Sequence, residues 1–222
     1  MRILQALIAM FLVTSSVAAH SQTAKIGPSA VWQPTPAFLA DAPSACAKSS
    51  DSAKCMIDQM TKAGAPVDAV SFSRALGKET HGEFGFMTGF QSQSPVSFAW
   101  VSYPMRANNV YGLLLVNGQP PMVNVEDLKL LDAKTMKQGP QFQDLKNQFP
   151  NVDIFPGDRD GKTWPNSQTG SDGGTQFVIG YPLRNGCASC AHAGDALFTW
   201  NFDAKGKFLG TTFIGMTPAP LK

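Results

Sequence analysis

The residues best suited to chemistry lie together in one short segment, Cys187-Ala188-Ser189-Cys190-Ala191-His192. This segment holds two of the four cysteines and one of the three histidines of the chain. Thiolates and imidazoles are zinc ligands, and a Cys-x-x-Cys pair can cycle between a dithiol and a disulfide. The spacing therefore allows a structural disulfide, a redox centre or a metal site.

A redox centre would use Cys187 as the attacking thiolate. Proteins usually favour such a thiolate by placing it at a helix N-terminus. Here the residues on both sides alternate between apolar and polar side chains, which predicts two strands joined by the cysteine-containing loop. A structural bridge is therefore the preferred interpretation. Covalent haem attachment would need a histidine directly after Cys190, where Ala191 stands, and we expect no cofactor.

A metal site could use the two cysteines and the histidine of this segment, with His81 as a fourth ligand. Structural zinc sites usually combine two ligand clusters, whereas this chain has one, so we predict no metal site. Glu79 and Glu83 bracket His81 at a spacing that acid–base catalysis could use. We interpret them as residues of a charged surface stretch and assign no catalytic residue.

The remaining cysteines, Cys46 and Cys55, complete an even set of four. Four cysteines allow three connectivities, and export to an oxidising compartment makes disulfides the default. We favour the local pairs Cys46–Cys55 and Cys187–Cys190, because each can close without long-range geometry. A lock between the N-terminal helical region and the sheet stays open as the alternative.

Residues 1–19 have the pattern of a secretory signal peptide. Arg2 precedes an apolar run and the small residues Val17-Ala18-Ala19, which predicts cleavage before His20. The apolar run is too short to span a bilayer, and no later segment approaches ~18 consecutive apolar residues, so no transmembrane segment is predicted. We therefore expect a periplasmic or secreted protein.

Length and composition suit one domain over residues 20–222. The chain has 222 residues, of which 43% are hydrophobic and 15% charged, with a net charge of +2. Basic residues form no run along the sequence. This composition argues against nucleic acid as a partner.

The first part of the domain combines an arm with a pair of helices. Residues 20–45 are rich in proline, alanine and serine and should form an extended arm. Ser50 or Asp51 can cap a helix that ends at Gly64, and Pro66 opens a second helix that ends near Gly77.

The rest of the chain predicts mainly antiparallel strands. Alternating apolar residues predict strands over 96–103, 110–116, 177–183, 198–202 and 208–216. Asn117-Gly118 signals a hairpin. Because the returning segment carries Pro120-Pro121, it must be an edge strand or an irregular arm. Helices are expected over 124–136 and 140–149, and a polar loop over 151–174. We predict an α+β fold, with a mainly antiparallel sheet covered on one face by helices.

Residues 177–213 resemble the inhibitory hairpin of the Ivy-type periplasmic inhibitors of vertebrate lysozyme. The shared arrangement is a strand, a cysteine-closed loop with a nearby histidine, a second strand, a charged turn and a third strand. In that family a Cys-Lys-Pro-His-Asp-Cys loop inserts its histidine into the lysozyme active site, and the fold is a secreted α+β domain. This chain has a shorter Cys187–Cys190 loop, and His192 lies outside it. The resemblance implies a loop that binds a protein partner.

We therefore expect an exported, non-enzymatic binding protein with a protein partner in the cell envelope. Inhibition of a cell-wall hydrolase is the most specific form of this prediction. The expected binding loop contains Ala188, Ser189 and His192, and a disulfide would lower the entropy cost of docking. The alternative is a periplasmic thiol–disulfide or metal-handling protein that uses Cys187 and Cys190.

Overall fold

The computed structural model describes residues 25–107, 110–157, 161–170 and 172–219. The predicted signal peptide, residues 1–19, lies outside this part of the chain. The helices are η1 (Pro28–Ala30), α1 (Pro36–Cys46), α2 (Ser52–Lys62), α3 (Val67–Glu79), η2 (Leu128–Leu130), α4 (Ala133–Gln138) and α5 (Pro140–Gln148). The strands are β1 (Phe86–Gln91), β2 (Ser97–Ser102), β3 (Tyr111–Val116), β4 (Met122–Asn124), β5 (Val152–Ile154), β6 (Asn166–Thr169), β7 (Thr175–Asn185), β8 (His192–Phe202) and β9 (Phe208–Pro218). This content confirms the predicted α+β class.

The N-terminal helices include the predicted pair, α2 and α3. The Asp51 side chain caps α2 by accepting a hydrogen bond from the Lys54 backbone N–H, as the sequence indicated. The arm expected to be extended differs from the prediction, because it contains α1. Thr35 caps this helix through the Phe38 N–H, and Pro36 supplies a pre-set φ at the first helical position.

The first sheet is antiparallel, with strand order β1-β2-β3-β4. One face packs on α3, where Phe72 and Leu76 share a buried cluster with Val101 and Leu114. β4 returns after Asn117-Gly118 as a three-residue edge strand, as the proline pair predicted.

The second sheet has the order β5-β7-β8-β9, and β6 also pairs with β7. The loop predicted over 151–174 is therefore wrong in part, since it contains β5 and β6. Both are short: β5 alternates over only three residues, Val152 to Ile154, and β6 is exposed throughout and has no apolar residue. Backbone pairing with β7 makes them strands.

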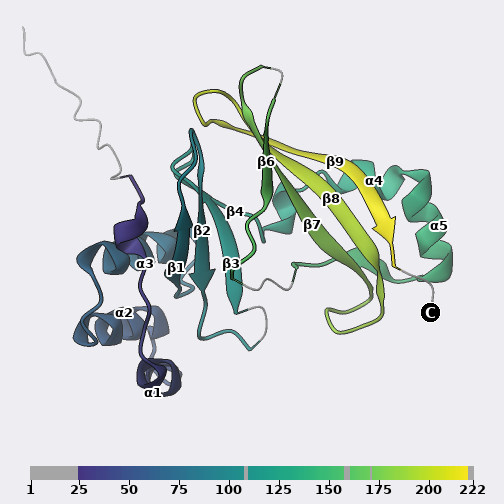
Figure 1. Cartoon of the computed structure of the whole chain (residues 1–222). Helices are drawn as coiled ribbons and strands as arrows, with labels where there is room; N and C mark the ends of the chain where they lie inside the picture. Colours follow the sequence, from purple (N-terminus) through teal and green to yellow (C-terminus); the bar gives the residue numbers. More distant parts are fainter. Residues whose placement is uncertain (1–24, 108–109, 158–160, 171, 220–222) are drawn as a thin grey trace, which may run out of the picture.

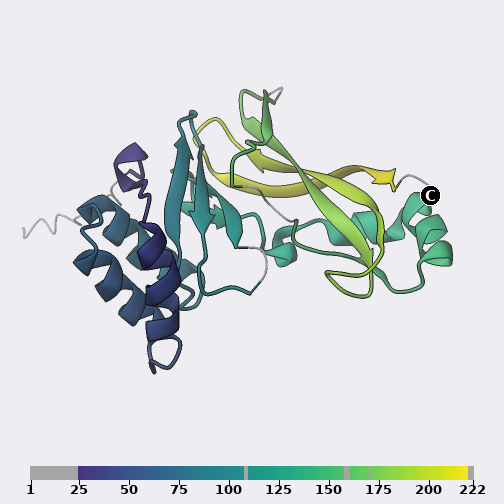
Figure 2. The same ribbon diagram turned by 60° about the horizontal axis from the view of Figure 1, so that its bottom comes forward.

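The two sheets share one core, which differs from the single sheet that was predicted. The Phe98 ring of β2 lies 4.7 Å from the Phe177 ring of β7, and Trp164 packs against Phe98 and Trp100. Figures 1 and 2 show helices α1–α3 at one end of the molecule, the β1–β4 sheet next to them, and the long β7–β9 strands with α4 and α5 at the other end.

Two short helices, α4 and α5, contribute to this shared core. Met136, Phe142 and Leu145 are buried in it. The helix expected to begin at Asn124 instead begins later, because the Asp132 side chain caps α4 through the Thr135 N–H. The helix predicted to begin at Pro140 is confirmed as α5.

Candidate functional site

The tip between β7 and β8 contains the predicted cysteine loop. Beyond the last paired residues, the Asn185 N–H donates to the Ala191 carbonyl at 3.0 Å, and the Cys190 N–H donates to the Cys187 carbonyl at 3.1 Å. Gly186 turns the chain with φ of +93°, a left-handed conformation that glycine adopts without steric cost. The tip is thus a defined turn at the end of two long paired strands.

A disulfide joins Cys187 to Cys190 and closes the turn. Ala188 and Ser189 inside the ring are exposed, and the two cysteines are half-buried. The Arg184 guanidinium donates to the Cys190 carbonyl at 3.3 Å, which ties the ring to β7. The loop therefore offers two exposed side chains on a cross-linked backbone.

His192 is the first residue of β8 and lies just outside the ring. Its Nε2 is 3.3 Å from Oδ1 of Asp195, and its side chain is 39% exposed. The three residues predicted for the binding loop therefore lie in two places: Ala188 and Ser189 are at the tip, and His192 lines a neighbouring pocket.

Both cysteine pairs are disulfides, Cys46–Cys55 and Cys187–Cys190, which are the local pairs that the spacing favoured. Among the residues that the structure describes, no three His, Cys, Asp or Glu side chains form a group that could hold a metal ion. His81, considered as a fourth ligand, lies in the turn after α3 and belongs to no such group. Metal binding at the tip would require the disulfide to be reduced first.

A pocket of about 710 Å³ opens between α5 and the ends of β7, β8 and β9 next to the tip. Leu145 and Leu183 are buried, and Phe149 and Met216 are half-buried, so these four form an apolar floor. Three exposed polar side chains of α5 and His192 surround the opening. The α5 residues are Gln141, Asp144 and Gln148. The volume lies within the range of small-molecule sites.

The opposite side of α5 has the reverse charge. Lys137 and Lys146 line a second hollow of about 660 Å³, together with Gly186 at the base of the tip. Lys137 Nζ pairs with Asp153 Oδ1 at 2.8 Å. The helix therefore separates an acidic and histidine-containing pocket from a basic hollow, and both adjoin the hairpin tip.

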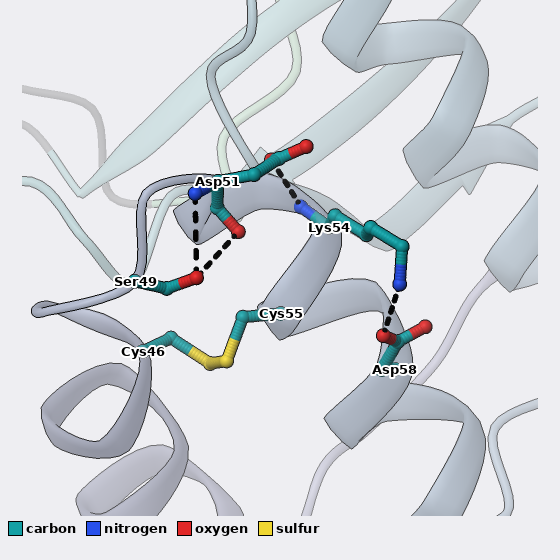
Figure 3. Close-up of a disulfide and its surroundings, with 6 residues drawn as sticks. All are labelled: Cys46, Ser49, Asp51, Lys54, Cys55 and Asp58. Atoms are coloured by element: carbon teal, nitrogen blue, oxygen red, sulfur yellow. Dashed lines mark hydrogen bonds and ion pairs between the residues drawn. A yellow bond between two sulfur atoms is a disulfide. The ribbon is translucent and has the colours of Figure 1, made fainter.

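The second disulfide lies far from this site and connects helices (Figure 3). Cys46, at the end of α1, is fully buried, and its bond to Cys55 ties α1 to α2. Asp51 caps α2 beside it, and Lys54 and Asp58 form an exposed i,i+4 ion pair at 2.7 Å. These contacts stabilise the helical layer and form no site.

Of the two carboxylates considered for acid–base chemistry, Glu79 is exposed at the end of α3, and Glu83 belongs to a cluster around Arg106 that also includes Glu126. Glu83 accepts a hydrogen bond from Arg106 Nη2 at 2.8 Å, and Glu126 accepts one from Nη1 at 2.7 Å. The guanidinium lies 3.7 Å above the Tyr103 ring. Burial lowers the pKa of Arg106, but the hydrogen bonds to both carboxylates outweigh it and raise the pKa overall. The cluster is a structural charge network between loops.

Fold and site together define a disulfide-containing α+β protein with an exposed loop and an adjacent pocket. Comparisons with protein-family models, with curated proteins and with solved structures found no significant match to this chain. Within the described ranges, no helix has the length and apolar character needed to cross a membrane.

Sequence reasoning identified the tip but missed the pocket. Gln141, Asp144 and Gln148 are spaced as one face of a helix, which is a signal in the sequence that α5 has a polar stripe. That stripe does not reveal which strands face it. Met216 and Ala219 approach His192 only because β9 pairs with β8.

Proposed function

We propose that this chain is an exported, non-enzymatic binding protein that engages a protein partner of the cell envelope through its disulfide-closed β7–β8 tip. The observation that carries the proposal is the exposed ring of Cys187 to Cys190 at the end of two eleven-residue strands. The predicted signal peptide and the two disulfides support export.

The tip suits docking because its backbone is already fixed, so binding costs little conformational entropy. The ring is cross-linked by the disulfide and held by the Asn185 N–H to Ala191 carbonyl bond. Ala188 and Ser189 are small and exposed, so the loop can enter a cleft without a long side chain blocking its approach. A preorganised loop avoids much of the ordering cost that weakens flexible binders.

Inhibition of a cell-wall hydrolase is the specific activity that we propose, in line with the resemblance of residues 177–213 to lysozyme-inhibitor hairpins. Such an inhibitor would place the tip in the substrate cleft of the hydrolase. His192 and Asp195 stand behind the tip, where they could contact the rim of that cleft.

The test is inhibition of vertebrate lysozyme on a peptidoglycan suspension, together with its Kd for the mature chain. Ala188→Arg should weaken both at least tenfold, because it adds a bulky charge at the tip. Ala204→Arg is the matched control, since Ala204 is exposed in the turn at the other end of β8 and should have no effect. Absence of inhibition by the wild type, or equal effects of the two variants, would overturn the proposal.

The second candidate is thiol–disulfide exchange, which the half-buried position of the Cys187–Cys190 pair in an exposed loop favours. A glutathione titration with alkylation and mass spectrometry separates the two functions. A potential below about −300 mV supports a structural ring, whereas about −120 to −200 mV supports exchange. Cys187→Ser would abolish exchange and keep the fold.

A further inference from the structure

The pocket beside the tip has an apolar floor and a polar opening that differ in chemistry. Leu145 and Leu183 close its base, and Met216, an adaptable side chain, forms one wall. Pockets of 300–1,000 Å³ with such a floor and a few polar groups are the usual form of small-molecule sites. At about 710 Å³, this one has room for an apolar group larger than one side chain.

Asp144 of α5 is the one carboxylate among the residues that line this pocket, and no lysine or arginine is among them. His192 also lines the pocket, and its Nε2 lies 3.3 Å from Oδ1 of Asp195. The lysines of this region, Lys137 and Lys146, line the hollow on the other side of α5. A ligand that enters the pocket therefore meets the Asp144 carboxylate, and a positive charge at the polar end of the ligand is favoured.

We propose that this pocket binds small amphipathic amines, with the apolar body on Leu145, Leu183 and Met216 and the ammonium group at Asp144. The glutamines of α5 and His192 provide further hydrogen-bonding groups at the opening. His192 is shared with the proposed contact to the hydrolase, but Asp144, Leu145, Leu183 and Met216 lie outside the tip, so variants of these residues test the pocket separately from partner binding by Ala188 and Ser189.

The test compares three probes of equal chain length, n-hexylamine, 1-hexanol and n-hexanoate, by NMR titration of the ¹⁵N-labelled mature chain. We expect hexylamine to shift the amide signals of Ala191, Ala193 and Met216 and to bind more tightly than hexanol. Hexanoate should bind most weakly. An exposed ion pair of about 1 kcal/mol corresponds to roughly a fivefold difference in Kd.

Two variants and a control locate the site. Asp144→Asn should weaken hexylamine binding about three- to tenfold and leave hexanol unchanged. Ala191→Trp, which fills the opening, should remove the shifts caused by both. Asp41→Asn changes an exposed carboxylate on α1 and should alter neither. The proposal is overturned if hexanoate binds as tightly as hexylamine, if no probe shifts the pocket amides, or if Asp41→Asn weakens binding as much as Asp144→Asn.

Discussion

The two disulfides should stabilise the protein by different amounts, because they close rings of different size. Cys46 and Cys55 are 9 positions apart, which makes a ring of ten residues, and Cys187 and Cys190 are 3 apart, which makes a ring of four. In the chain-entropy treatment, removing these rings costs about 2.7 and about 1.9 kcal/mol. The experiment replaces both cysteines of one pair by alanine, either Cys46 and Cys55 or Cys187 and Cys190.

Burial of Cys46 increases the difference in stabilisation between the two disulfides. Cys46 is fully buried among Phe38, Met56 and Met60, so Cys46→Ala also removes packed sulfur. We add about 1 kcal/mol for this loss, which gives a total of about 3–4 kcal/mol for the helical-layer pair. The tip cysteines are half-buried and contribute no comparable packing, so the total for that pair stays near 2 kcal/mol.

Urea unfolding monitored by tryptophan fluorescence measures both values, since Trp100 and Trp200 are buried in the shared core. In both double variants, the slope of the free energy of unfolding against urea concentration should equal that of the wild type. The reasoning is refuted if the tip pair costs as much as the helical-layer pair. If the variant without the Cys187–Cys190 disulfide stays folded but no longer binds its partner, the loss of affinity comes from the loss of a preorganised loop.

Two further predictions concern buried tyrosines. Tyr181 is fully buried, and its hydroxyl donates a hydrogen bond to the Val125 carbonyl at 2.6 Å. Tyr181→Phe should therefore lower the free energy of unfolding, measured in urea, by about 1–2 kcal/mol. Tyr111→Phe is the control and should change this free energy little, because the Tyr111 ring is only half-buried. Burial, with a further contribution from Glu126, raises the pKa of Tyr103. The folded protein therefore keeps this phenol neutral where the unfolded chain ionises, and stability should fall above pH 10 by up to about 1.4 kcal/mol per pH unit from this group. Tyr103→Phe should make that fall shallower; equal slopes for variant and wild type between pH 10 and 11 would contradict the assignment.

Local signals predicted most of the elements. Asp51 and Pro66 marked the starts of α2 and α3, and Pro140 marked α5, because caps and fixed φ angles act within a single turn. Thr35-Pro36 carried a similar signal for α1. The proline-rich composition of the surrounding arm outweighed it in the prediction.

Elements that depend on partners far away in the chain could not be predicted in the same way. β5 and β6 pair with β7 through their backbones, and Asn166 to Thr169 are exposed, so no side-chain pattern distinguishes β6 from a loop. The packing of Trp164 against Phe98 and Trp100 of β2 likewise depends on residues that are distant in the sequence.

By itself, the sequence determined the α+β class and the loop between two strands, because alternation along the chain is sufficient for these features. Cysteine spacing favoured the local pairs, and the structure decided between them and a long-range lock. Only the tertiary structure decided that His192 faces a pocket and not the tip. It also decided that the Asp144 side of α5 faces the pocket beside the tip and that the Lys146 side faces the second hollow. Such features depend on which strands a helix packs against, and that is decided when residues distant in sequence bury their apolar surfaces together.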